Sequence, residues 1–136
     1  MIGHRLIMVI DDDESVRSAL ADLLAEEGYR VVAFADGGAA LAYVLAGELP
    51  DLILLDPMLR PVDGWRFRAE QMMNPALASI PVIVVPAALA AAHHREVDAE
   101  VVRESFEMRT LLSRIRRLCP PADPTAADAD RSRRTA

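Results

Sequence analysis

The sequence predicts an α/β domain built on a doubly wound, five-stranded parallel sheet with helices on both faces. Short apolar runs alternate along the chain with segments in which apolar residues fall at helical spacing. Short apolar runs bounded by turn-forming residues are typical of strands buried in a parallel sheet. Regular alternation of strands and helices implies right-handed crossovers, which place helices on both faces. The 136 residues, 52% of them hydrophobic, are enough for one domain with a single core.

Five runs give the expected strands. They span residues 6–10, 30–34, 52–55, 80–85 and 100–103. The first and third runs are unbroken and apolar, and each stops at an acidic residue. The fourth run ends at Pro86, and the fifth is short. With a helix after each strand, these runs make five strand–helix units.

Five segments that follow these strands have helical character. They span residues 14–27, 37–46, 65–73, 87–97 and 108–118. Glycine ends the first two, at Gly28 and Gly47, as is common just past a helix C-terminus. Asn74 and Pro75 close the third, because a residue before proline disfavours helical backbone. The fourth is rich in alanine, and the last carries apolar residues at helical spacing.

The rest of the sequence indicates where the domain ends and in which compartment the protein lies. Residues 120–136 lack an apolar face, so we expect a disordered tail, or the start of a linker, after a domain spanning residues 1–119. No apolar stretch approaches the roughly 20 residues of a membrane span, and no export signal is present, so we expect a cytoplasmic protein with no membrane association. The single cysteine, Cys119, cannot form an internal disulfide.

The net charge of the chain makes one class of partner unfavourable. The formal net charge of −6 argues against direct binding of nucleic acid by this chain. All 15 basic residues apart from histidine are arginines, so no lysine amine is available for chemistry.

Three acids stand where two expected strands end. Asp11 and Asp12 follow the first strand, and Asp56 follows the third. In an open α/β sheet the ligand site lies beyond the carboxyl ends of the strands, so these acids are expected to share one crevice. Oxygen-only ligands suit Mg²⁺ or Mn²⁺. Acids of residues 11–14 could instead cap the following helix, although capping does not account for Asp56.

Several spaced segments resemble the receiver domain of two-component response regulators, of the CheY-like type. They are residues 9–17 around the acidic pair, 50–56 ending in Asp56, the Asp63 and Gly64 pair, and 80–85. The resemblance covers roughly residues 5–118 and implies the flavodoxin-like (βα)5 receiver fold. It also implies a signalling domain rather than an enzyme, with at most self-catalysed phosphoryl transfer.

The resemblance assigns roles to the acids. Asp56 would be the phosphoacceptor, attacking a phosphoryl group supplied by a histidine kinase or a small phosphodonor. Asp11, Asp12 and Asp56, with the backbone carbonyl of Met58, would hold Mg²⁺. Partners would be a histidine kinase or another signalling protein, and a second copy of the chain could pair through the face formed by the helix expected at 87–97, the strand at 100–103 and the helix at 108–118.

Three positions depart from the family pattern. Pro86 stands where receivers carry a Thr or Ser, and it has neither a hydroxyl nor an N–H group. Glu104 stands where receivers carry a lysine, and Val101 replaces the aromatic residue that usually changes rotamer. We therefore expect an atypical receiver with impaired or absent phosphorylation switching that acts through protein contacts.

Two alternatives stay open. One is a conventional receiver that a histidine kinase phosphorylates on Asp56. The other, more remote, is an Asp-nucleophile phosphatase of the haloacid dehalogenase type, with Asp11 and Asp13 as its acids. That class also needs a lysine and a cap or a longer chain, and neither is present in the sequence.

Overall fold

The structure, a computed structural model, describes residues 4–56, 61–85 and 105–121, with the side chains of 61–66 excluded. The strands are β1 (Leu6–Ile10), β2 (Arg30–Phe34), β3 (Leu52–Leu55) and β4 (Val82–Val84). The helices are α1 (Glu14–Glu26), α2 (Gly37–Leu45), α3 (Pro61–Met73), α4 (Pro75–Ala78) and α7 (Phe106–Leu118). The strand expected at 100–103 and the helix expected at 87–97 lie outside the described residues.

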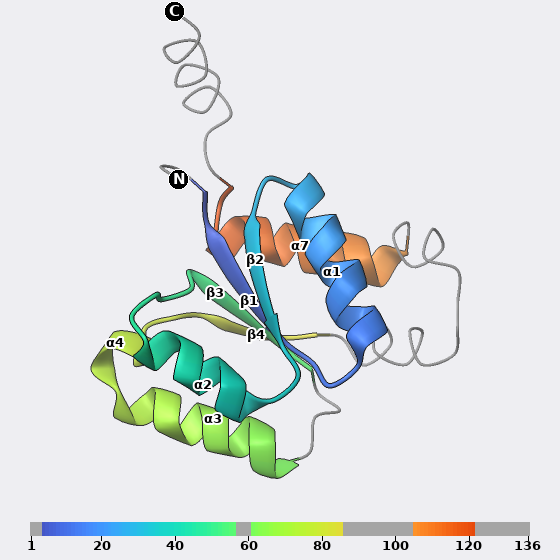
Figure 1. The fold of residues 1–136 in the computed structure, drawn as a ribbon. Coiled ribbons are helices and arrows are strands. Elements are labelled where there is room, and N and C mark those ends of the chain that lie inside the picture. The colour runs from blue at the N-terminus through green and yellow to red at the C-terminus, as the bar shows by residue number, and fades with distance from the viewer. Residues whose placement is uncertain (1–3, 57–60, 86–104, 122–136) are drawn as a thin grey trace, which may run out of the picture.

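The sheet confirms the predicted doubly wound architecture. Its order is β2-β1-β3-β4, and every described pair is parallel. The register pairs Ile7 with Val31 on one side and with Leu52 on the other. Figure 1 shows α1 and α7 on one face of the sheet and α2, α3 and α4 on the other. Within the described ranges, no helix is long and apolar enough to cross a bilayer.

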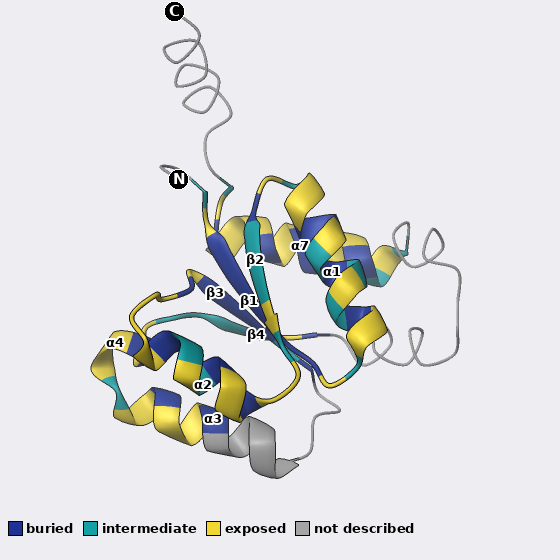
Figure 2. Cartoon of the chain, in the orientation of Figure 1, coloured by how far each residue is buried: buried dark blue, intermediate teal, exposed yellow. Residues whose placement is uncertain are grey.

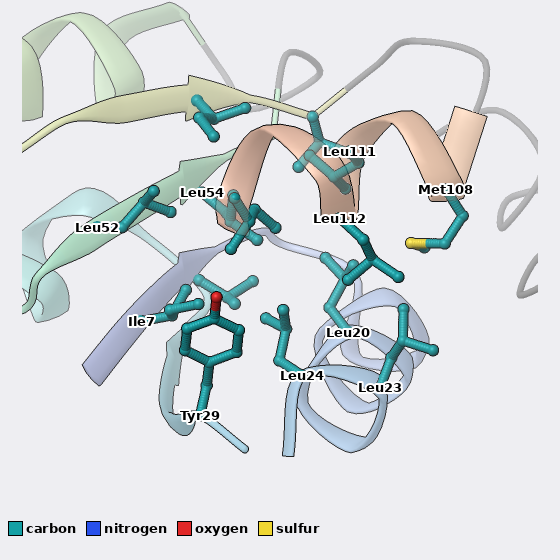
Figure 3. Close-up of a cluster of buried hydrophobic side chains, with 14 of the residues drawn as sticks. Ile7, Leu20, Leu23, Leu24, Tyr29, Leu52, Leu54, Met108, Leu111 and Leu112 are labelled. Atoms are coloured by element: carbon teal, nitrogen blue, oxygen red, sulfur yellow. The ribbon is translucent and has the colours of Figure 1, made fainter. Parts of the chain in front are cut away.

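Alternate residues of the strands pack into two hydrophobic cores, one on each face of the sheet. Toward α1 and α7 the sheet presents a first set of buried side chains: Ile7, Val9, Leu52, Leu54, Ile83 and Val85. Figure 3 shows part of this cluster, with Ile7, Leu52 and Leu54 labelled. Toward α2, α3 and α4 it presents a second set: Met8, Ile10 and Ile53. Because β1 and β3 supply both cores, they are buried along almost their whole length, as Figure 2 shows. This double burial explains their unbroken apolar runs.

Several element boundaries differ from those the sequence predicts. Strand β4 spans Val82–Val84 rather than residues 80–85, and α1 and α2 each end one residue earlier than expected. Helix α3 begins at Pro61 rather than at residue 65, and proline is favoured at the first helical position because its missing N–H is not needed there. Helix α3 ends at Met73 as expected, but Asn74 then caps a further short helix, α4, through a 3.0 Å bond to the Ala76 amide. Helix α7 begins at Phe106, with Ser105 as its cap.

A buried glutamine joins α3 to the chain that leads into β4. The Gln71 side-chain amide donates to the carbonyl of Leu77 at 2.9 Å and to that of Ile80 at 3.1 Å, and its oxygen accepts from Arg68 at 2.6 Å. Gln71 is completely buried. The Leu77 carbonyl also accepts the Ile80 amide at 3.1 Å, so Gln71 adds a second bond to the turn that joins α4 to β4.

Replacing Gln71 with methionine should therefore lower the free energy of unfolding by about 1–3 kcal/mol, because the shape is kept while the bonds to the two carbonyls are lost. Urea denaturation measures this change. The matched control is Met72→Gln at the neighbouring exposed position, where we expect a change within about 0.5 kcal/mol. Equal effects of the two variants would contradict this role for Gln71.

Candidate acidic site

The ends of β1 and β3 place two acids side by side. The Asp11 amide donates to the carbonyl of Phe34 at 3.0 Å, and the Asp56 amide donates to the carbonyl of Ile10 at 3.0 Å. These bonds extend the sheet one residue past each strand. Both acids therefore lie at the carboxyl edge of the sheet, where the chain crosses from one side of β1 to the other and where open α/β sheets bind ligands.

Three carboxylates converge at this edge. Asp11, Asp12 and Asp56 each offer one carboxylate oxygen, and these three oxygens lie within 4.8 Å of one another. Asp11 is 1% exposed and Asp56 is 3% exposed, whereas Asp12 is exposed. The site thus has two carboxylates at its floor and one at its rim, so a ligand from solvent would meet Asp12 first.

The following residue has a different role. The Asp13 carboxylate accepts the amides of Ser15 at 2.8 Å and Val16 at 3.2 Å, and so caps α1. The helix-capping interpretation therefore holds for Asp13, whereas the carboxylates of Asp11 and Asp12 lie beside that of Asp56. The phosphatase alternative gains no support, because it needs the Asp13 carboxylate beside Asp11 as a second acid.

Burial and neighbouring charge make Asp11 hard to ionise. Loss of water around this carboxyl is the largest cause that raises its pKa, from 3.8 to about 7. The Asp13 amide, which donates to Asp11 Oδ1 at 2.9 Å, lowers the pKa and partly offsets this effect. The charge of Asp56 and a side-chain hydrogen bond with it raise the pKa further. At neutral pH the site therefore favours a bound positive charge, either a proton or a cation.

The donor set fits a hard divalent cation. All three side chains offer carboxylate oxygen, which suits Mg²⁺ or Mn²⁺ and does not suit soft thiophilic metals. The remaining positions that sequence reasoning placed at the site lie outside the described residues: Met58, Pro86, Val101 and Glu104.

Sequence reasoning gave no role to Arg17, whose guanidinium Nη1 donates to the Asp11 carbonyl at 2.8 Å. The sequence does carry a signal for this interaction, because Arg17 lies in the first turn of α1, where the helix dipole disfavours positive charge. A cation at that position calls for a compensating interaction, and the acidic loop supplies one.

The raised pKa of Asp11 predicts how stability depends on pH. The folded state binds more protons than the unfolded state between pH 3.8 and about 7, so the free energy of unfolding falls as pH rises through this window. The slope contributed by Asp11 is at most about 1.4 kcal/mol per pH unit. Urea denaturation without divalent cations, at pH 5 and 7.5, measures it. Asp11→Asn should remove this contribution, whereas Asp22→Asn on the exposed face of α1 should keep it. An unchanged slope in Asp11→Asn would contradict the assignment.

Comparison with known proteins agrees with this geometry. The sequence pattern of the response regulator receiver domain matches residues 7–115. The sensory transduction protein RegX3 of Mycobacterium tuberculosis is 34% identical over 120 residues, covering 81% of this chain and 48% of RegX3. The chain spans less than half the length of the first curated relatives it matches, between 18% and 48%.

Solved structures show the same fold. The chemotaxis response regulator CheY4 of Vibrio cholerae superimposes with a TM-score of 0.63 at 22% identity, over 85% of this chain and 98% of CheY4. The Mn²⁺-bound form of response regulator Rcp1 superimposes with a TM-score of 0.53 at 25% identity, over 78% of this chain and 96% of Rcp1. By the match to its residues 7–115, the chain belongs to the response regulator receiver domain family.

Proposed function

We propose that Asp56 is the phosphoacceptor of this receiver domain and that Asp11, Asp12 and Asp56 together hold Mg²⁺. The observation that carries the proposal is the convergence of these carboxylates, with one oxygen of each within 4.8 Å of the others, at the carboxyl edge of β1 and β3. The solved structure of Rcp1 in its Mn²⁺-bound form supports it, since Rcp1 has the same fold and binds a hard divalent cation.

Each acid has a distinct role in the proposal. The Asp56 carboxylate attacks phosphorus, one oxygen–phosphorus bond forms as the bond to the donor breaks, and an aspartyl phosphate results. Asp11 anchors the floor of the site and Asp12 closes its rim, while the carbonyl of Met58 is the proposed fourth protein ligand. A divalent cation, when bound, neutralises charge on the transferred oxygens.

We further propose that the switch half of the domain is impaired. Strand β4 runs beside β3, and the Val85 amide donates to the Leu55 carbonyl at 2.9 Å. Pro86 follows Val85 in the sequence, and proline offers no hydroxyl to bind a phosphoryl group. Glu104 supplies a negative charge where receivers carry a lysine. A ligand that makes no different contacts in two conformations shifts no equilibrium between them.

The domain boundary and partners complete the proposal. The proposed domain comprises residues 1–119, and the described fold supports this end point because the Tyr29 hydroxyl donates to the carbonyl of buried Cys119 at 2.6 Å. We propose protein partners, a histidine kinase or another signalling protein, reached in the cytoplasm without direct contact to nucleic acid. Helix α7 carries an exposed Phe106 on the part of the described surface proposed for pairing with a second copy.

Magnesium should stabilise the folded protein. At a hundred times its dissociation constant a ligand adds about 2.7 kcal/mol to the free energy of unfolding, so the melting temperature should rise with millimolar Mg²⁺. Asp56→Asn should remove the Mg²⁺ response and, by relieving repulsion, raise the stability of the metal-free protein by about 1 kcal/mol. Asp22→Asn is the control that keeps the response. A wild-type melting temperature that does not move up to tens of millimolar Mg²⁺ would exclude the metal site.

Phosphorylation should be weak and without structural consequence. With acetyl phosphate or beryllofluoride we expect little modification of Asp56, and no change in the α7 surface or in oligomeric state, because Pro86 and Glu104 supply none of the usual contacts. Pro86→Thr combined with Glu104→Lys should recover part of the phosphoryl binding. Intact mass and amide chemical shifts measure both effects. Ready labelling of wild-type Asp56, with shifts spreading along residues 86–106, would favour a conventional receiver instead.

A further inference from the structure

One arginine reaches back from helix α1 to the acidic loop. Arg17 Nη1 donates to the Asp11 carbonyl at 2.8 Å, across six residues of sequence. That carbonyl belongs to the peptide group that joins Asp11 to Asp12. The guanidinium therefore holds the peptide plane from which the Asp12 side chain leaves the backbone.

Three further backbone groups of this loop are hydrogen-bonded as well: the Asp11 amide, the Asp13 amide and the Asp13 carbonyl. The Asp11 amide donates to Phe34 at 3.0 Å, and the Asp13 amide donates to Asp11 Oδ1 at 2.9 Å. The Arg17 amide donates to the Asp13 carbonyl at 3.0 Å as part of α1. Arg17 thus bonds the loop at both of its ends, once through the side chain and once through the backbone.

The position of Arg17 is unfavourable for a cation considered by itself. It lies in the first turn of α1, near the positive end of the helix dipole. Arg17 is half-buried, and its bond to the Asp11 carbonyl is partly shielded from solvent. Its fixed fork of donors suits a directed bond to a carbonyl better than a flexible ammonium would.

We propose that Arg17 is a positioning residue of the acidic site, which rests on the proposed function of that site in binding Mg²⁺. Its bond to the Asp11 carbonyl keeps the exposed Asp12 carboxylate beside the two buried ones. Arg17 acts through the backbone and touches neither the cation nor the phosphoryl group. Groups that orient metal ligands in this way commonly change metal affinity by 10- to 100-fold when they are removed.

The direction in which one substitution changes the Mg²⁺ affinity separates this positioning role from a purely electrostatic one. A cation near a cation site repels the metal, so removing its charge alone would tighten binding of Mg²⁺. Loss of positioning weakens binding instead. We therefore expect Arg17→Met to weaken Mg²⁺ binding about 10-fold. The Mg²⁺ affinity of Arg17→Lys, which keeps a cationic donor, should lie between those of Arg17→Met and the wild type.

Isothermal titration with MgCl₂ measures these affinities on the full chain. The matched control is Arg30→Met, since Arg30 is also a half-buried arginine with a strong hydrogen bond, 2.9 Å to Glu48, but on the far end of the sheet. The control should keep the wild-type affinity. Tighter or unchanged binding by Arg17→Met would overturn the proposal.

A second measurement needs no metal. In the metal-free protein, amide hydrogen exchange at Asp13 should speed up about 10-fold in Arg17→Met relative to Arg30→Met, because the peptide that orients Asp11 Oδ1 is released. Unchanged exchange would overturn the positioning role. If the wild type binds no Mg²⁺, the proposed metal site fails, and the exchange rate at Asp13 still decides the role of Arg17.

Discussion

The parallel pairing of β1 with β3 is the interaction on which the site depends. Its register pairs Ile10 with Leu55, and the next residue of each strand is an acid. Backbone bonds from Asp11 to Phe34 and from Asp56 to Ile10 carry the sheet past both strand ends. Burial on both faces fixes this register, because a slip by one residue would turn each core side chain to the opposite face. The acids are thus brought together by the packing of apolar residues around them.

The same packing creates the electrostatic cost that gives the site its chemistry. Asp11 and Asp56 are removed from water beside each other, and burial raises the pKa of Asp11 to about 7. Asp13 does not share this environment, since its carboxylate caps α1. Arg17 then holds the peptide between Asp11 and Asp12. Two buried acids, one rim acid and one anchored loop form an arrangement in which a divalent cation would balance the charge.

The sequence predicted most of the sheet and the convergence of its acids, because the two strands buried on both faces need unbroken apolar runs and both of these runs stop at an acid. It placed the start of α3 wrongly at residue 65, because Pro61 is as compatible with a loop as with the first helical position. It gave no role to Gln71 or Arg17, since each bonds to backbone carbonyls that apolar periodicity does not encode. Glu104 and Pro86 remain predictions, because they lie outside the described residues.

The most direct test of the account is whether one divalent cation is held where β1 and β3 end. Mn²⁺ broadens the signals of nearby nuclei, so the amides of Asp11, Asp12 and Asp56 should lose intensity at substoichiometric Mn²⁺, and excess Mg²⁺ should restore them. The amides at the far end of the sheet, such as those of Arg30 and Leu52, should stay sharp. Broadening spread evenly over the exposed acids of the chain, with no preference for these three residues, would contradict the account.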